Sequence, residues 1–337
     1  MQIVWINASE LESDDEKANP CSSSSLSSSS VVSEANDDAW TLLRECNGVV
    51  VPGGFGERGA EGKIVAARYC RLNKVPYLGV CLGMQVMVIE FARSKLGITG
   101  ATSEEFSNAT STDAVAGEKE KEKEKNVVLF MPEGSKDHLG GTMRLGARTT
   151  IVQQGSLAAS VYGVTKSCTT VMERHRHRYE VDPDRVVSLE KAGLVFSGRD
   201  TTGLRMEICE LPSVDHPFYF GTQFHPEFKS RPHRPSPPFY CLVAAALGQQ
   251  DQPSFTAAGE MWQEQTKGQG QSGSLVNVSS PLRYMAQPNA AKRSSSVTSQ
   301  TGDGSPYREN VKYGAHFPTL PTVASIDGTA KKKSKTN

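Results

Sequence analysis

The chain has 337 residues, and its 37 Lys and Arg are balanced by 37 Asp and Glu, so no net charge draws it toward nucleic acid or anionic lipid. No apolar run approaches the roughly 20 residues that span a bilayer, and the amino-terminal residues lack the pattern of a secretory signal, which predicts a soluble cytoplasmic protein. Seven scattered cysteines without a C-x-x-C pair indicate reduced thiols rather than a disulfide framework or a zinc knuckle.

Three stretches are too polar for a packed core: Cys21–Ser33, Glu118–Lys125 and nearly everything after about Gln249. The Glu/Lys run is typical of a solvated loop or a short surface helix. The closing KKKSK could serve as a nuclear localisation signal or bind an anionic surface. We therefore expect a domain at 1–248, low-complexity insertions at about 21–36 and 108–125, and a disordered low-complexity tail at 249–337.

The remaining residues alternate short β-branched runs with helical patterns, which is typical of a parallel sheet flanked by helices. The expected strands are Gln2–Ile6, Gly48–Val51, Tyr77–Val80, Val127–Phe130, Thr149–Val152, Leu194–Ser197, Arg205–Glu210 and Phe218–Phe224. The expected helices are Gly62–Asn73, Met84–Lys95 and Pro238–Leu247.

The stretch G-V-C-L-G at Gly79–Gly83 has the form of a nucleophile elbow, in which a strand turns sharply into a helix and exposes the central side chain. Glycine is needed on both sides because the bend brings the backbone close to the neighbouring strand and helix. The helix that starts at Leu82 aims its amide groups at the sulfur of Cys81, which favours the thiolate. Cys81 is therefore a candidate nucleophile, and the alternative is a small buried cysteine in a tight turn.

A second motif, Q-F-H-P-E-F at Gln223–Phe228, follows an apolar run that we expect to be a strand. His225 and Glu227 are two residues apart, so in extended chain they project to the same side. Glu227 can then accept from one imidazole nitrogen while the other faces Cys81, which is the arrangement of a catalytic triad. For an isolated H-x-E the alternative is a surface salt bridge.

A glycine-rich turn at Val49–Gly59 ends another expected strand. An oxyanion hole needs two backbone N–H groups aimed at one point, and small residues let the backbone approach a substrate. We assign one donor to Gly54, with Gly53 as the alternative, and the other to Leu82. A phosphate cradle is the weaker interpretation, because the spacing does not fit the phosphate-binding glycine motifs.

The run R-H-R-H-R at Arg174–Arg178 admits two further interpretations. His175 and His177 stand at i and i+2 and suit a metal ion, but no third or fourth ligand follows at a suitable spacing, so we assign no metal. A basic strand at this place suits contact with a phosphate group.

Taken together, these motifs resemble the class I glutamine amidotransferase family, and within it the glutaminase domains of CTP synthases. The resemblance extends over most of residues 1–248 and includes E-G-K-I after the glycine turn, G-G-T-M-R-L-G-A-R-T at Gly140–Thr149 and E-R-H-R-H-R-Y-E-V at Glu173–Val181. It implies a three-layer, doubly wound, mostly parallel sheet of the flavodoxin-like order 2-1-3-4-5.

In this family a cysteine attacks the side-chain amide of glutamine, releases ammonia and leaves a glutamyl thioester that water hydrolyses. The resemblance implies that Cys81 is the nucleophile, that His225 is the general acid and base, and that Glu227 orients the imidazole. It places the glutamine contacts at Gly54, Leu82, Gly83, Met84, Gln85, Glu105 and Arg178.

Two of these contacts carry charge. Glu105 would bind the ammonium of the substrate and Arg178 its carboxylate, which suits a zwitterionic amino acid. Phe55 resembles the family position near an allosteric GTP site, and ordinary packing is the alternative.

CTP synthases also carry an amino-terminal synthetase domain that binds ATP, Mg²⁺ and UTP and uses the ammonia, whereas this chain has no phosphate loop with a lysine. We therefore expect no cofactor in this chain. Its expected partners are L-glutamine, a synthetase domain and further copies in a homo-oligomer, which is a tetramer in the full-length family.

The opening M-Q-I-V-W-I-N-A-S-E-L resembles the second strand of the family, so we expect the first strand and helix to be absent. Strand one is interior to a 2-1-3-4-5 sheet, and its loss would leave unpaired edges and a bare apolar face. The expectation is a carboxyl-terminal piece of a longer CTP synthase that folds poorly alone.

The leading functional hypothesis is glutamine hydrolysis that supplies ammonia for ATP-dependent amination of UTP to CTP. Another class I glutaminase or a γ-glutamyl hydrolase is a second hypothesis, although G-T-M-R-L-G-A-R-T and R-H-R-H-R-Y-E-V argue against both. The non-enzymatic alternative is an inactive regulatory or assembly module.

Overall fold

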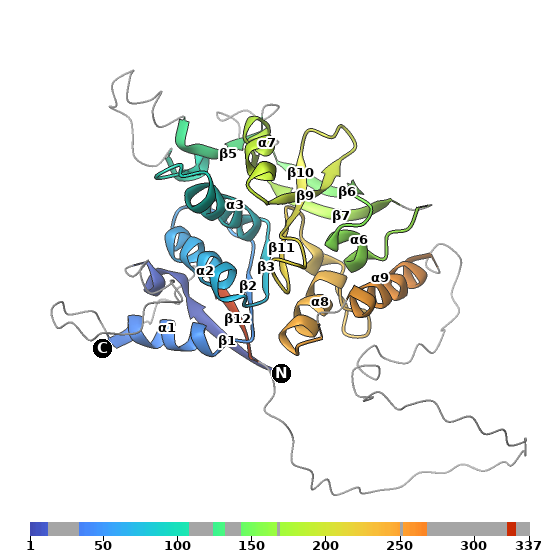
Figure 1. The fold of residues 1–337 in the computed structure, drawn as a ribbon, viewed down its shortest axis with the longest axis horizontal. Helices are drawn as coiled ribbons and strands as arrows, with labels where there is room; N and C mark the ends of the chain where they lie inside the picture. The colour runs from blue at the N-terminus through green and yellow to red at the C-terminus, as the bar shows by residue number, and fades with distance from the viewer. Residues whose placement is uncertain are drawn as a thin grey trace, which may run out of the picture.

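The structure is a computed structural model that describes residues 1–12, 34–107, 124–131, 143–166, 169–249, 252–267 and 322–327 (Figure 1). The serine tract, most of the Glu/Lys run and much of the predicted tail lie outside the described residues. The predictions made for those stretches therefore stay predictions.

A nine-stranded sheet forms the centre of the described fold. Five neighbouring strands run parallel, in the order β1 (Gln2–Asn7), β12 (Thr322–Asp327), β2 (Gly48–Val51), β3 (Tyr77–Val80) and β11 (Tyr219–Thr222). Four antiparallel strands continue the sheet: β10 (Met206–Glu210), β9 (Val195–Asp200), β6 (Arg144–Val152) and β7 (Thr170–His177). A smaller sheet contains β4 (Thr102–Ser103), β5 (Asn126–Phe130) and β8 (Tyr179–Val181).

Helices cover both faces of the large sheet (Figure 1). One face carries α1 (Glu34–Glu45), α2 (Ala60–Asn73), α3 (Leu82–Lys95) and α7 (Pro183–Lys191). The other face carries α6 (Leu157–Tyr162), α8 (Pro237–Ala246) and α9 (Gln252–Lys267). Three short helical segments complete the described elements: η1 (Ala8–Leu11), α4 (Glu104–Ser107) and η3 (Pro226–Phe228).

The alternation of side chains along the strands builds one apolar core on each face. Tyr77 and Leu78 are neighbours in β3 and project to opposite sides, Tyr77 into the core under α2 and α3 and Leu78 into the core under α6 and α8. Both side chains are fully buried, and burial of a side chain such as Leu78 stabilises the fold by roughly 1.5–3 kcal/mol. The predicted three-layer α/β class is therefore confirmed.

The position between β1 and β2 corrects one prediction. Strand β12 occupies it and pairs in parallel on both sides, with Ala324 opposite Val4 and Val49. The order β1-β12-β2-β3-β11 is the 2-1-3-4-5 order, with a strand from near the carboxyl end in the first-strand position. The expectation of unpaired edges at this position is wrong, because residues of the predicted tail pair there.

Helix α9 corrects the prediction for the tail at a second place. Phe255 and Trp262 are 1% and 5% exposed, and Phe255 belongs to the core shared with α6 and α8. Gln252–Lys267 therefore belong to the packed fold, although the sequence predicted disorder from residue 249 onward. A few large apolar residues anchor this helix, and the polar average composition of the tail concealed them.

Most of the predicted elements match the structure to within a few residues, and Gly48–Val51 and Tyr77–Val80 have the predicted bounds. The sequence did not predict α1, α6, α7, β7 or β8. The predicted strand at Thr149–Val152 begins earlier, at Arg144, because it pairs along its whole length with β7.

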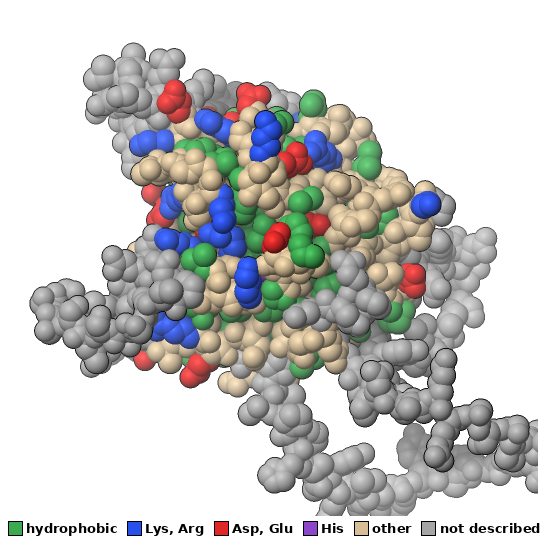
Figure 2. Space-filling view, in the orientation of Figure 1, with side chains coloured by type: hydrophobic (Ala, Val, Ile, Leu, Met, Phe, Trp, Pro, Cys, Tyr) green, Lys and Arg blue, Asp and Glu red, His purple; other side chains and the backbone are tan. Residues whose placement is uncertain are grey.

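The surface shows no preference for one charge on the face drawn in Figure 2, where Lys and Arg side chains are interspersed with acidic and apolar ones. This mixture agrees with the zero net charge of the chain. Within the described ranges, no helix combines the length and the apolar character that crossing a bilayer requires.

Candidate active site

Strand β3 bends sharply into helix α3, and Cys81 stands at the bend. Its backbone has φ 53° and ψ −102°, so a residue other than glycine lies in the left-handed region. Such a conformation costs roughly 1–3 kcal/mol and persists only where the surrounding structure enforces it. This is the strand-to-helix bend that the G-V-C-L-G motif predicts.

The glycines beside Cys81 are required by close approach of the backbone. A methyl group added to Gly79 would lie 2.4 Å from the carbonyl oxygen of Gly83, and one added to Gly83 would lie 2.1 Å from that of Val51. No side chain fits at these distances. Only glycine lets β2, β3 and the start of α3 pack this closely.

The sulfur of Cys81 is buried among polar groups. The residue is 3% exposed, and its Sγ lies 3.7 Å from Nε2 of Gln223 and 3.9 Å from the carbonyl oxygen of Arg176. The backbone amides of Met84 and Gln85 donate to the carbonyl oxygen of Cys81, each at 3.1 Å. Cys81 is thus the N-cap of α3, at the positive end of the helix dipole.

His225 and Glu227 meet on the turn after β11. Nδ1 of His225 lies 2.6 Å from Oε1 of Glu227, and the backbone N–H of His225 donates to the carbonyl oxygen of Arg174 on β7 at 2.8 Å. The prediction that the two side chains share one side of an extended strand is wrong. The strand ends at Thr222, and the 3-10 turn Pro226–Phe228 folds the carboxylate back onto the ring.

The imidazole of His225 adjoins the cysteine across Gly53. A methyl group added to Gly53 would lie 2.7 Å from Cε1 of His225 and 3.4 Å from Cβ of Cys81. Burial would lower the pKa of His225, but its interactions with Cys81 and Glu227 outweigh burial and raise it to about 10. Although Nε2 makes no hydrogen bond of ordinary geometry to the described residues, the sulfur is near enough to favour the imidazolium.

The glycine turn after β2 also approaches the first residue of α3. A methyl group added to Gly54 would lie 3.4 Å from Cδ2 of Leu82. The two residues predicted to donate to an oxyanion are therefore adjacent, and Leu82 directly follows Cys81 in the chain. Gly53, the alternative donor, lies against the imidazole of His225.

Glu105, Arg178 and Phe55 lie together around the same turn. Oε1 of Glu105 accepts from the backbone N–H of Gly56 at 2.9 Å, and the guanidinium of Arg178 lies 6.0 Å from the centre of the Phe55 ring. Burial raises the pKa of Glu105, and the Gly56 amide, Arg178 and Lys63 oppose the rise. Glu105 and Arg178 thus interact electrostatically, and both contact residues of the glycine turn.

The other predicted substrate contacts form the first turn of α3. The carbonyl oxygen of Gly83 accepts from the hydroxyl of Tyr77 at 2.8 Å, and the side chain of Met84 is fully buried. Nε2 of Gln85 donates to the carbonyl oxygen of Tyr179 at 2.9 Å and to Oε1 of Gln223 at 3.2 Å. Gln85 therefore ties α3 to the segment after β7 and to the segment after β11.

The run Arg174–Arg178 lies mainly in β7, which is not among the expected strands, although a basic strand was one interpretation of this run. The arginines of the strand are exposed and the histidines are buried, so the alternation of Arg and His is the period of two that identifies a strand. Nδ1 of His175 lies 3.1 Å from Nε2 of His177, so the two rings contact each other directly at hydrogen-bond distance. In the part of the chain that the structure describes, no group of three His, Cys, Asp or Glu side chains is arranged to hold a metal.

Comparison with known proteins agrees with this geometry. The family model for glutamine amidotransferase class-I matches residues 21–245. CTP synthase of Schizosaccharomyces pombe is 47% identical over 260 residues, covering 77% of this chain and 38% of that protein. CTP synthase of Dictyostelium discoideum is 48% identical over 248 residues, covering 73% and 38%. The glutaminase domain of Trypanosoma brucei CTPS, solved with bound acivicin, superposes with a TM-score of 0.54 at 40% identity, over 64% of this chain and 77% of that one.

The chain therefore belongs to the class I glutamine amidotransferase family. Within that family, its similarity is to CTP synthases and to the glutaminase domain of one of them. The chain spans less than half of the length of the curated CTP synthases that it matches.

Proposed function

We propose that this chain is a glutaminase, which hydrolyses L-glutamine to glutamate and ammonia through Cys81, His225 and Glu227. The observation that carries the proposal is the contact of Cys81 and His225 across Gly53, with Glu227 2.6 Å from the far side of the imidazole. A raised imidazole pKa of about 10 keeps His225 protonated at neutral pH, as an imidazolium beside the sulfur of Cys81. The sulfur supplies the nucleophile and the imidazolium supplies the proton that the reaction needs.

The first half of the reaction forms a thioester. The thiolate of Cys81 attacks the side-chain amide carbon of glutamine, and the C=O electrons move onto oxygen, where the N–H groups of Gly54 and Leu82 stabilise the charge. The intermediate collapses, the C–N bond breaks, and the leaving nitrogen takes the proton from Nε2 of His225 to depart as ammonia. Glu227 holds the Nδ1–H and keeps the ring in position.

The second half removes the acyl group. His225, now neutral, accepts a proton from a water molecule that attacks the thioester carbon, and the second tetrahedral intermediate expels the thiolate. The new carboxyl group releases its proton to solvent and the product leaves as glutamate, while the proton taken from the attacking water stays on His225. The thiolate and imidazolium pair is thereby restored.

The α-carbon end of the substrate is held by two charged side chains. Glu105 binds its ammonium and Arg178 its carboxylate, and the first turn of α3, Leu82–Gln85, contacts the side chain that leads to the amide. The position of Glu105 and Arg178 around the glycine turn supports this assignment. The side chain of Met84 is buried, so its contact is through the backbone.

In the complete protein, the ammonia serves ATP-dependent amination of UTP to CTP in a synthetase domain, which binds ATP and Mg²⁺. The similarity to CTP synthases supports this step. The complete protein is a cytoplasmic homo-oligomer, and Phe55, half exposed beside Arg178, contacts an activating GTP. The chain itself needs no cofactor for glutamine hydrolysis.

Ammonia release from glutamine by wild type, Cys81→Ala and Cys46→Ala tests the proposal. Cys46 is also buried, and its thiol bonds only to the carbonyl oxygen of Leu42 among the described residues, at 3.0 Å, so its variant is the matched control. We expect near-total loss with Cys81→Ala and no loss with Cys46→Ala. A glutamine-like diazo-ketone should add to Cys81 in the wild type.

Two outcomes would contradict the proposal. Ammonia release that survives in Cys81→Ala would show that another group performs the attack. Folded wild type that neither releases ammonia nor takes up the diazo-ketone would favour an inactive regulatory or assembly module.

A further inference from the structure

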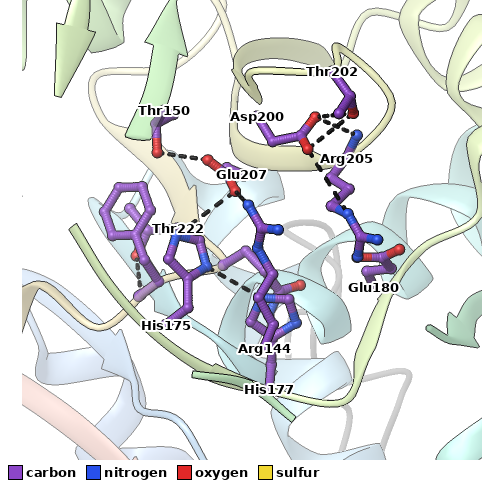
Figure 3. A network of polar contacts seen from close by, with 12 residues as sticks. Arg144, Thr150, His175, His177, Glu180, Asp200, Thr202, Arg205, Glu207 and Thr222 are labelled. Carbon is purple, nitrogen blue, oxygen red and sulfur yellow. Dashed lines mark hydrogen bonds and ion pairs between the residues drawn. The ribbon is translucent and has the colours of Figure 1, made fainter. Parts of the chain in front are cut away.

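The inward face of β7 carries a column of buried polar side chains. Glu173, His175 and His177 are each 3% exposed or less and point to the same side of the strand. Nδ1 of His175 lies 3.1 Å from Nε2 of His177, and Nδ1 of His177 lies 3.1 Å from the carbonyl oxygen of Tyr179. The two rings therefore form a chain of contacts that ends on a backbone carbonyl. Figure 3 shows the contact between the two rings.

The carbonyl at the end of this chain fixes where the protons lie. The oxygen of Tyr179 can only accept, so Nδ1 of His177 carries a hydrogen. Burial lowers the pKa of His177 to about 3 and that of His175 to about 2, so both rings are neutral. Nε2 of His177 therefore accepts, and Nδ1 of His175 donates to it.

The far end of the chain lies beside Glu207. Oε1 of Glu207 lies 3.6 Å from Nε2 of His175 and accepts from Nη2 of Arg144 at 2.7 Å, and Oε2 accepts from the hydroxyl of Thr150 at 2.6 Å (Figure 3). Both carboxylate oxygens have donors of their own, and Nε2 of His175 has no hydrogen-bond partner among the described residues. His175 therefore acts on His177 through its Nδ1 alone, and the contacts of His177 with His175 and with the Tyr179 carbonyl oxygen fix the orientation of its ring.

The carbonyl oxygen of Tyr179 receives a second hydrogen bond, from Nε2 of Gln85 at 2.9 Å. One donor comes from β7 and the other from α3, the helix that Cys81 begins. Tyr179 directly follows Arg178, and the carbonyl oxygen of Arg176 lies 3.9 Å from the sulfur of Cys81. The backbone that carries Arg178 is therefore fixed relative to the sulfur from both sides.

We propose that His177, oriented by His175, is a positioning residue that sets the distance between Arg178 and Cys81. This inference rests on the proposed function, in which Arg178 binds the substrate carboxylate and Cys81 attacks the side-chain amide. The distance between those two groups then selects substrates by the length of their side chain. Asparagine is one methylene shorter than glutamine, so it cannot reach both groups at once.

Steady-state kinetics of the full chain with glutamine and asparagine test this inference. His177→Ala removes one of the two donors to the Tyr179 carbonyl, and we expect KM for glutamine to rise about five- to tenfold while kcat changes less than about twofold. The preference for glutamine over asparagine should fall as well. His177→Asn restores an N–H donor near the position of Nδ1 and should recover most of the lost affinity.

His216 provides the matched control. It is also a buried histidine that contacts a backbone carbonyl, that of Cys70 at 3.0 Å, and its pKa is lowered to about 4 by burial. His216→Ala should lower the thermal unfolding midpoint about as much as His177→Ala but leave KM for glutamine unchanged.

The outcomes separate this inference from the proposed function. If the wild type releases no ammonia, the proposed function fails. If the wild type is active but His177→Ala has an unchanged KM and an unchanged preference for glutamine, the inference alone is wrong. A loss of kcat that His177→Asn does not restore would also overturn it.

Discussion

The Nδ1 atom of His225 lies 2.6 Å from Oε1 of Glu227, and the two side chains differ in their access to solvent. The imidazole is 11% exposed, whereas the carboxylate is 43% exposed. Solvent screens a carboxylate at that exposure, so its effect on the imidazole comes mainly from the short hydrogen bond. The short hydrogen bond therefore both orients the ring and helps to raise its pKa.

Glu227→Gln should lower kcat for glutamine hydrolysis roughly 10- to 100-fold with little change in KM, because the amide holds the imidazole less firmly and carries no charge. Steady-state ammonia assays measure both parameters. Glu190→Gln is the matched control, since Glu190 makes an ion pair with Arg199 at 2.7 Å and is 36% exposed. An equal loss of kcat in both variants would rule out a specific role for Glu227.

Much of this site was predictable from local sequence. The elbow at Cys81 and the glycine turn that contains Gly54 need glycine at positions where the backbone is closely approached. Short sequence motifs therefore indicated both features. The spacing of His225 and Glu227 gave the right partners but the wrong backbone. A separation of two residues fits a strand and a 3-10 turn equally well. Pro226, at the start of η3, favours the turn because proline cannot donate a backbone hydrogen bond to a neighbouring strand.

The supporting residues were less predictable, because their partners are distant in the chain. Gln85 donates to the carbonyl oxygen of Tyr179, 94 residues further along the chain, where His177 donates as well, and Glu207 accepts from Thr150 across 57 residues. No local pattern reports such pairings. At Thr322–Asp327 the tail prediction failed for a related reason, since β12 pairs with β1 and β2, which are distant in the chain, on its two sides.

Gly53→Ala should abolish activity while leaving the fold intact. The added methyl group would lie 2.7 Å from Cε1 of His225, so the imidazole must move away from Cys81. We expect kcat to fall at least about 100-fold, measured by ammonia release, with little change in the thermal unfolding midpoint.

Gly97→Ala should show the opposite behaviour and is the control for Gly53→Ala. Gly97 has φ 68°, and no atom lies within 4 Å of an added methyl group. The substitution strains the backbone by about 1 kcal/mol but touches nothing in the site, so it should lower stability and spare kcat. Full activity in Gly53→Ala would contradict the position assigned to the imidazole.

Glu173→Gln should stabilise the protein above pH 7. Burial raises the pKa of Glu173 from 4.5 to about 7, with Glu227 adding to the rise and Lys229, 3.8 Å away, opposing it. The raised pKa of Glu173 lowers the stability of the folded protein as pH rises from about 4.5 to about 7. Over this range the carboxyl group is already ionised in the unfolded chain but still protonated in the folded one, so rising pH favours unfolding. The amide has no proton to lose, so the variant avoids this loss.

Thermal unfolding at pH 5 and pH 8 checks the effect. The gain in midpoint of Glu173→Gln over the wild type should be larger at pH 8 than at pH 5. Glu210→Gln is the contrasting variant, because Glu210 is equally buried but accepts hydrogen bonds from the amides of Leu157 and Ala158 at 2.7 and 2.8 Å. It should destabilise the protein at pH 8, and a destabilising Glu173→Gln at that pH would refute the assignment.

Ala324→Pro should destabilise the protein by about 3 kcal/mol or more. Ala324 lies in β12 between Val4 and Val49, and a proline there cannot donate a backbone hydrogen bond to either neighbouring strand. Urea denaturation of the full chain measures the change. A chain that ends at Lys267 lacks β12 and should lose at least as much, since β1 then has no neighbour in the sheet. If both variants unfold at the wild-type urea concentration, β12 does not contribute to the sheet in solution, and the position between β1 and β2 is open to another strand.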